Sequence, residues 1–108
     1  MQREKLTEAG KEQLGKFIEK YVKEKEPEFV EFFNKAEAIN KRIHQIELLP
    51  GLGKKYTKEI LEQREIKEFD SFEDIKKRIP NLPFPEKTVE KRIFQELTEF
   101  ERYNLFTN

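Results

Sequence analysis

The residues with the clearest chemical potential lie in one short segment, Pro50-Gly51-Leu52-Gly53-Lys54-Lys55. Its two glycines permit a positive φ angle and leave the backbone without side-chain cover, so another chain can approach closely. A helix that begins just after Gly53 would present unpaired N–H groups and the positive end of its dipole, which both favour an anion. The segment therefore predicts a binding site for an anionic group such as a phosphate.

Apolar residues at helical spacing precede this segment and predict a helix that leads into it. The apolar stripe consists of Ile39, Ile43 and Ile46. We expect this helix over about residues 40–48. His44, the only histidine, falls off the stripe and is expected at the surface without a catalytic role.

A second helix is predicted directly after the glycines, from Gly53 to about Arg64. Leu52 is expected to point inward as an apolar plug, and Thr57 occupies the place of a small residue packed against the first helix. Two helices joined in this way are typical of a helix-hairpin-helix, a motif that contacts the backbone of nucleic acids. The alternative is an ordinary glycine C-cap followed by another helix, which does not require two glycines around one apolar residue.

Three lysines in the first turns of the second helix predict a basic patch. Lys54 and Lys55 follow Gly53 directly, and Lys58 shares a face with Lys54 at a spacing of four residues. In the alternative interpretation this face is merely solvated, with Lys58 paired to Glu62. The contact residues predicted for nucleic acid are therefore Pro50, Gly51, Leu52, Gly53, Lys54, Lys55 and Lys58.

The composition limits the kind of protein this is. The chain has 108 residues, which suits one compact domain, and its 22 basic residues cancel its 22 acidic ones. A net charge of zero argues against coating nucleic acid by bulk attraction, so binding is expected to be local. The absence of cysteine excludes disulfides and thiol chemistry. Without a long apolar run or signal peptide, we expect a soluble cytoplasmic protein, and the high lysine and glutamate content resembles that of thermophile proteins.

Two amphipathic helices are predicted ahead of the hairpin. The first runs from about Glu8 to Glu24, with Thr7 as its cap. Its apolar stripe consists of Leu14, Phe17, Ile18, Tyr21 and Val22. Pro27 fits the first turn of the second helix, whose phenylalanines at positions 29, 32 and 33 are expected to fill the core rather than to stack on bases.

A second helix-turn-helix is predicted about 30 residues after the first. Ser71 suits the N-cap of its first helix, and the nearby acids Asp70, Glu73 and Asp74 are explained by the helix dipole, so no metal site is predicted. Its last helix carries Val89, Ile93, Leu97 and Phe100.

The turn of this second hairpin, at residues 79–82, has lost the glycines of the first. Asn81 is expected to adopt the left-handed conformation in place of glycine. Pro83 and Pro85 remove amide donors where a phosphate would lie, so the second hairpin is interpreted as degenerate and structural. The region of Arg78 and Lys87 is expected near the partner strand of a bound nucleic acid.

The predicted fold is all-α, and the chain divides into three parts. Residues 1–38 form an N-terminal helical pair, residues 39–100 a tandem helix-hairpin-helix domain, and residues 101–108 an extended C-terminal tail. Because Tyr103, Leu105 and Phe106 are too apolar for a free end, the tail is expected to pack on this domain or on a missing partner.

Several blocks of the sequence resemble an uncharacterised archaeal family of predicted RNA-binding proteins. The matching blocks are residues 28–36, 42–55, 72–75 and 103–106. The resemblance implies nucleic-acid binding, with Gly51, Gly53, Lys54 and Lys55 at the matched contact positions. It also implies an OB-like β-barrel ahead of the hairpin domain, and no such barrel precedes Leu6. Both an excised C-terminal domain and a naturally short member remain open.

The hairpin also resembles that of helix-hairpin-helix DNA glycosylases. Lys55 falls where some of these enzymes keep a Schiff-base lysine, and Glu73 is the nearest carboxylate by spacing. The chain is about half the size that such an enzyme needs, so no catalytic activity is predicted.

We therefore expect a non-catalytic domain that contacts the phosphate backbone of DNA or structured RNA without base specificity. No cofactor is predicted; by analogy, hairpin carbonyls at residues 48–53 are able to hold a monovalent cation. The alternative function is a protein-protein interaction module within a larger nucleic-acid-processing or ribosome-associated assembly.

Overall fold

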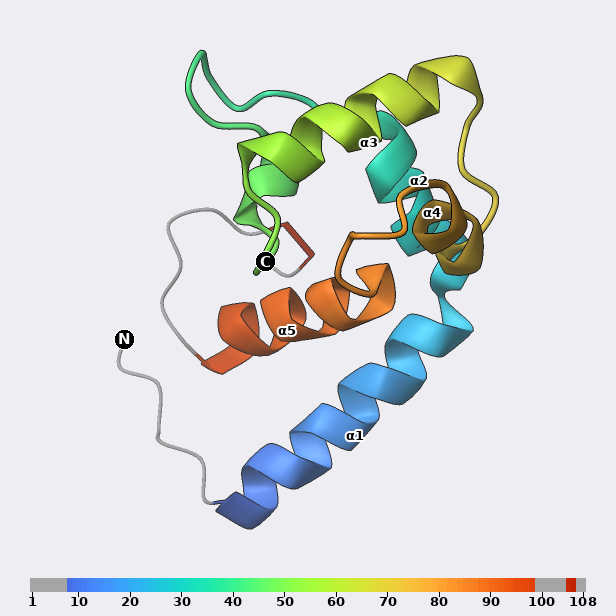
Figure 1. Cartoon of the computed structure of the whole chain (residues 1–108). Coiled ribbons are helices and arrows are strands. Elements are labelled where there is room, and N and C mark those ends of the chain that lie inside the picture. Colours follow the sequence, from blue (N-terminus) through green and yellow to red (C-terminus); the bar gives the residue numbers. More distant parts are fainter. Residues whose placement is uncertain (1–7, 99–104, 107–108) are drawn as a thin grey trace.

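The computed structural model describes residues 8–98 and 105–106, and within them the fold is all-α, as predicted (Figure 1). The elements are α1 (Glu8–Glu24), α2 (Glu26–Lys35), the single-turn 3-10 helix η1 (Gln45–Leu48), α3 (Lys54–Ile66), α4 (Phe72–Arg78) and α5 (Pro85–Thr98). The expectations for residues 1–7 and for Tyr103 lie outside the described residues. No helix in the described part of the chain is long and apolar enough to cross a membrane.

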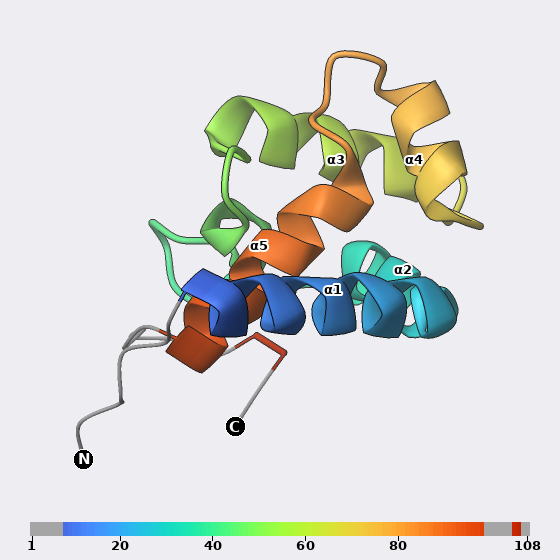
Figure 2. The same cartoon turned by 90° about the horizontal axis from the view of Figure 1, so that it is seen from below.

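Helix α5 lies between α1 on one side and α3 on the other, as both views show (Figures 1 and 2). The predicted bounds of α1 are confirmed, and its residues Ile18 and Val22 are buried. Phe17 and Tyr21 of the same stripe remain 66% and 40% exposed. The apolar stripe of α1 is therefore wider than the surface it covers.

The phenylalanines of α2 belong to the core, which confirms the structural interpretation. Phe29 and Phe33 are buried, and Phe32 is partly buried against them. Phe106 packs edge-on against Phe29 and Phe32, with ring centroids 5.3 and 5.0 Å apart. Leu105 and Phe106 therefore pack on this domain, which was one of the two expectations for these residues.

The helix predicted over residues 40–48 is wrong. Residues 38–44 instead form a tight turn closed by an isolated antiparallel bridge between Ala38 and His44, and only one 3-10 turn follows. The side-chain oxygen of Asn40 accepts hydrogen bonds from the N–H groups of Arg42 and Ile43, at 2.7 and 2.9 Å. Such a local bond offers the backbone an alternative to the helix, and periodicity alone does not detect it.

His44 is buried rather than at the surface, because it caps η1. Its ring Nδ1 accepts a hydrogen bond from the backbone N–H of Ile46 at 3.1 Å, and the backbone N–H of His44 donates to the carboxylate of Glu47 at 2.9 Å. Burial lowers the pKa of His44, and the positive charge of Arg64 lowers it further, against the opposing effect of Glu47 and Glu37. The imidazole is therefore a structural cap.

Polar side chains fasten the helices to one another. Arg64 of α3 donates to the carbonyl oxygens of Phe33 and Ala36, at 3.1 and 2.8 Å, and so caps the C-terminus of α2. The predicted N-cap of α4 is confirmed, since Ser71 Oγ accepts the N–H of Asp74 at 3.0 Å. The bonds from Arg64 thus join α3 to the C-terminus of α2.

Candidate nucleic-acid interface

Residues 49–55, which link η1 to α3 and include the first two residues of α3, form the first corner. Leu49 and Leu52 are buried, and the N–H of Leu52 donates to the carbonyl of Leu49 at 3.1 Å. Pro50 and Gly51 lie between them, and Gly51 has a φ of 85°. Proline followed by a residue with positive φ is the arrangement of a type II turn, so glycine is required at this position. The buried leucines hold the corner against the core.

The N-terminus of α3 is open to solvent. Gly53, Lys54 and Lys55 are exposed, and no side chain caps the helix or places a carboxylate in its first turn. In the described part of the chain, the N–H groups of Lys54, Lys55 and Tyr56 have no recorded acceptor. A Cβ atom built on Gly53 would meet nothing within 4 Å. Free donors, the helix dipole and open space are thus combined at one point.

The three lysines of the predicted patch have different environments. Lys54 is tied down: its ammonium lies 3.2 Å from the carboxylate of Glu47 and 2.7 Å from the carbonyl oxygen of Arg42. Burial raises the pKa of Glu47, but the hydrogen bonds from His44 and Lys54 outweigh it, so the pKa is lowered overall. Lys55 and Lys58 are exposed, and neither forms an ion pair with another described residue. The pair of Lys58 with Glu62, which the alternative interpretation required, does not form.

Thr57 is buried, as expected of the small residue at this position. It lies in the second turn of α3, and its N–H donates to the carbonyl of Gly53 at 3.0 Å. Together with Leu52, it anchors the start of α3 while the preceding amides stay exposed.

Residues 79–85, which link α4 to α5 and include the first residue of α5, form the second corner. Its backbone repeats part of the first corner. Ile79 and Leu82 are buried, and the N–H of Leu82 donates to the carbonyl of Ile79 at 3.0 Å, as Leu52 does to Leu49. The prediction of a left-handed Asn81 is wrong, because no described residue other than glycine has a positive φ. Pro83 and Pro85 carry no N–H, so this corner offers fewer donors to an anion.

The two corners lie against each other. Tyr56 of α3 donates its hydroxyl to the carbonyl oxygen of Asn81 at 3.0 Å. A Cβ atom on Gly51 would lie 3.6 Å from Cγ of Pro83. The second corner thus supports the first.

Arg78 and Lys87, expected near a partner strand, are engaged within the protein. The guanidinium of Arg78 lies 4.5 Å from the ring centroid of Phe69, donates to the carbonyl of Gln63 and pairs with Asp74 at 3.4 Å. The ammonium of Lys87 lies 3.4 Å from a carboxylate oxygen of both Glu19 and Glu90. Neither charge is placed for contact with a second strand.

Two basic residues that the sequence interpretation missed stand beside the first corner. Lys41 and Arg42 are exposed on the turn at residues 38–44, whose Arg42 carbonyl accepts the ammonium of Lys54. The misplaced helix concealed them; the sequence signal was Asn40, a residue that favours turns, directly before two cations.

One of the hairpin carbonyls suggested for a monovalent cation is already engaged. The Leu48 carbonyl already accepts a hydrogen bond from the guanidinium of Arg92 at 3.3 Å. That positive charge would repel a second cation at the same oxygen.

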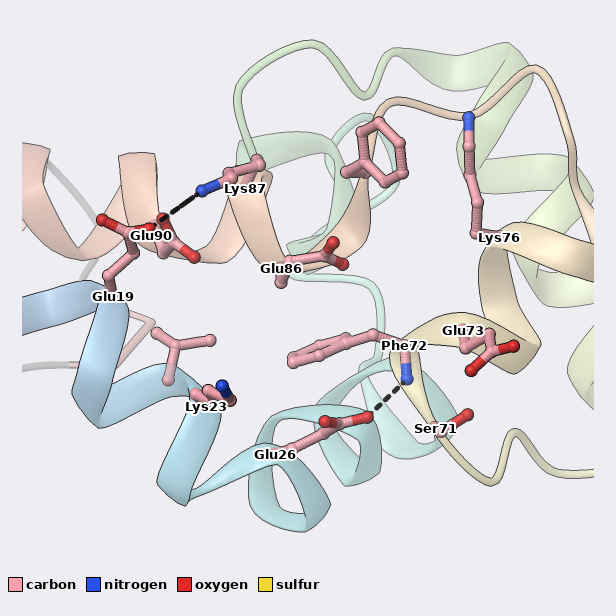
Figure 3. Close-up of a pocket in the computed structure, with 12 residues that line it drawn as sticks. Glu19, Lys23, Glu26, Ser71, Phe72, Glu73, Lys76, Glu86, Lys87 and Glu90 are labelled. Atoms are coloured by element: carbon pink, nitrogen blue, oxygen red, sulfur yellow. Dashed lines mark hydrogen bonds and ion pairs between the residues drawn. The ribbon is translucent and has the colours of Figure 1, made fainter.

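A separate cavity of about 510 Å³ lies between α1, α4 and α5 (Figure 3). Its apolar surface comes from Val22, Phe72 and Phe84. Its charged lining consists of Glu19, Glu26, Glu73, Glu86 and Glu90 with Lys23, Lys76 and Lys87. Glu73 lines this cavity and Lys55 does not, so the structure does not bring the two glycosylase-like residues into one pocket. No group of three or more metal-ligating side chains occurs among the residues described.

Comparison with known proteins identifies relatives but no activity. The model of the family described as "Protein of unknown function (DUF655)" matches residues 1–108. Uncharacterized protein MJ0038 of Methanocaldococcus jannaschii is 41% identical over 105 residues, which are 95% of this chain and 48% of that protein. The crystal structure of Af1531 from Archaeoglobus fulgidus superposes with a TM-score of 0.85 at 40% identity, covering 100% of this chain and 62% of that one. This chain therefore spans about half of the first relative and less than two thirds of the second.

Proposed function

The chain belongs to the DUF655 family, and we propose that it is a non-catalytic domain that binds the phosphate backbone of DNA or structured RNA. In this proposal the first corner acts as one hairpin of a tandem helix-hairpin-helix, and the second corner is its degenerate partner. The phosphate lies at the N–H groups of Lys54, Lys55 and Tyr56 in the first turn of α3, with the ammonium groups of Lys55 and Lys58 beside it.

One observation carries the proposal: α3 begins at the exposed residues Gly53, Lys54 and Lys55, and its first turn is uncapped and without acidic residues. Helices in proteins are commonly capped by a side-chain oxygen, and α4 of this same chain has such a cap in Ser71. At α3, glycine occupies the N-cap, and no side chain competes with an external acceptor. An external phosphate oxygen would satisfy these donors.

The same geometry limits affinity and specificity. The corner offers main-chain donors and lysines, which read no base edges, so binding is expected to be independent of sequence. Only a few phosphates are neutralised, which gives an expected slope of about −2 to −4 for log affinity against log salt concentration.

Fluorescence anisotropy with labelled single strands and duplexes of DNA and RNA tests this function. Affinity is measured at several salt concentrations from about 25 to about 200 mM, over which electrostatic binding weakens steeply. Sequence-independent binding that weakens with this slope supports the proposal. Absence of binding to every probe at the lowest salt would reject it.

The alternative, a protein-interaction module, is favoured by the cavity between α1, α4 and α5. Five glutamates and three lysines line it, while Lys87 is matched by Glu19 and Glu90, and Lys76 donates to the carbonyls of Pro80 and Leu82. The surplus of carboxylates around Phe72 and the 56%-exposed Phe84 fits a basic segment of a partner protein.

This alternative predicts the effect of one double variant. Glu73→Lys/Glu86→Lys should abolish capture of a basic peptide and leave nucleic-acid binding unweakened. If wild-type protein binds no arginine-rich peptide more tightly than a neutral peptide of equal length, the cavity is not such a docking site.

A further inference from the structure

We propose that the turn at residues 38–44 is a second contact with nucleic acid, and that the ligand is therefore double-helical. The inference rests on the proposed function of the first corner and names its substrate class. Lys41 and Arg42 carry the contact.

The turn is a built structure. The N–H groups of Ile39 and Asn40 both donate to the carbonyl of Ile43, at 2.8 and 3.2 Å, and the N–H of Gln45 donates to the carbonyl of Glu37 at 3.1 Å. The side chain of Asn40 closes the turn from inside. The two cations therefore sit on a backbone whose conformation is fixed before any ligand arrives, which reduces the entropic cost of binding.

The turn is fastened to the first corner through charged groups. Lys54, the first residue of α3, donates to the carbonyl of Arg42 at 2.7 Å, and its ammonium also lies 3.2 Å from Glu47. The other oxygen of Glu47 accepts the N–H of His44, the residue that closes the turn. The position of the turn relative to the exposed amides is thus defined.

Both views show where this turn stands. It projects from the body of the protein as a loop, on the same side as the start of α3 (Figures 1 and 2). Lys41 and Arg42 are exposed, and neither side chain forms an ion pair with a residue that the structure describes. Only the carbonyl of Arg42 is engaged with Lys54, so its guanidinium is available to a ligand.

Two separate contacts on one face limit the kind of nucleic acid that fits. In a tandem hairpin the second hairpin is the natural contact for a second strand, but here Pro83 and Pro85 remove donors, and Arg78 and Lys87 are engaged internally. The projecting turn supplies the missing cations on the other side of the first corner. A guanidinium on a narrow projection suits a groove between two phosphate chains, where the negative potential is high.

A single strand would need different features. Proteins bind single strands by stacking bases on aromatic side chains along a basic groove. The aromatic residue nearest to the exposed amides is Tyr56, and its hydroxyl is already bound to Asn81. The chemistry on this face therefore favours a double helix, of DNA or of RNA.

The test compares Lys41→Ala/Arg42→Ala with wild type on four probes of equal length: duplex DNA, duplex RNA and the two single strands. We expect about a ten-fold loss of affinity for a duplex, a salt slope less steep by about two, and single-strand affinity within about two-fold of wild type. The duplex that shows the loss identifies the source. Lys16→Ala/Lys20→Ala on α1 removes the same charge elsewhere and should change none of these values.

Three outcomes distinguish this inference from the proposed function. Unchanged duplex affinity in the Lys41→Ala/Arg42→Ala variant overturns the inference while leaving the first corner intact. Equal losses on strand and duplex overturn the double-helical ligand. If wild-type protein binds no probe, the proposed function itself fails. Circular dichroism of each variant should match that of wild type, because both side chains are exposed.

Discussion

Pro83 lies against Gly51, so that a Cβ atom added to this glycine would be 3.6 Å from Cγ of the proline. This distance is an ordinary van der Waals contact, and the space alone would accept alanine. The backbone would not, because φ at Gly51 is 85°. The first corner thus depends on glycine for its conformation and on the second corner for support.

The two glycines of the first corner should respond differently to substitution. Gly51→Ala places a Cβ in the left-handed region and should lower the free energy of unfolding by about 1–2 kcal/mol. Gly53 has an extended backbone and open space around it. Gly53→Ala should therefore lower the free energy of unfolding by well under about 1 kcal/mol. Urea denaturation measures both, and equal losses would contradict this assignment of the strain.

The role of the Lys54 amide can be separated from that of its side chain. Lys54→Pro removes both, Lys54→Ala removes only the side chain, and proline is well tolerated at the first position of a helix. Gly53 has a ψ of −167°, which suits a residue that precedes proline. We expect Lys54→Pro to bind nucleic acid about five-fold more weakly than Lys54→Ala, from the loss of one charge-assisted hydrogen bond of about 1 kcal/mol.

Anisotropy titrations of these two variants at one salt concentration provide the measurement, with thermal melts as a check on folding. Equal affinity of the proline and alanine variants would mean that the phosphate does not lie at the Lys54 amide.

Stability should depend strongly on the buried pair of Arg92 and Glu96. Arg92 Nε lies 2.9 Å from Glu96 Oε2, and the Glu96 carboxylate also accepts the N–H groups of Leu105 and Phe106, at 2.6 and 3.0 Å. Glu96→Gln removes the carboxylate charge beside a buried guanidinium and should cost about 3 kcal/mol. Arg92→Met/Glu96→Leu should cost less than the sum of the two single changes, as measured by urea denaturation. Strict additivity would show that the two charges are not coupled.

The buried His44 predicts how stability depends on pH. Because its pKa is lowered in the folded protein, the unfolded chain binds a proton more readily. The free energy of unfolding should therefore fall as pH decreases through 6.5 towards the lower pKa of the folded state. His44→Asn keeps a side-chain acceptor for the N–H of Ile46 and removes the titration, so its stability should stay flatter between about pH 7 and 5.

The same slope in wild type and His44→Asn, measured by urea denaturation at each pH, would assign the effect to other groups. Titration of Glu47, whose pKa is lowered from 4.5, adds its own loss of stability at lower pH in both proteins and serves as an internal reference.

The sequence predicted regular helices well because their signals are strong and local. The bounds of α1 followed from its apolar stripe, and the start of α4 followed from Ser71. The buried phenylalanines of α2 followed from their bulk alone.

Residues 38–48 were mispredicted because two local hydrogen-bonding side chains outweigh an apolar period there. Asn40 closes a turn, and His44 caps a single 3-10 turn. The isoleucine spacing alone does not distinguish this arrangement from a helix. Some contacts at the site join distant segments, and spacing in the sequence does not reveal them. Lys54 holds the Arg42 carbonyl beside the first corner, Arg78 reaches the Gln63 carbonyl, and Lys87 pairs with Glu19.

The guanidinium of Arg92 joins the carbonyl of Leu48 to a helix that begins more than thirty positions later in the chain. A synthetic peptide that spans only η1 to α3 would lack this clasp, the Tyr56 bond to Asn81 and the support of Pro83. The segment from Gly51 to Lys55 is therefore not transferable by itself. Grafted onto another protein without α5, it should lose the backbone conformation on which phosphate binding depends.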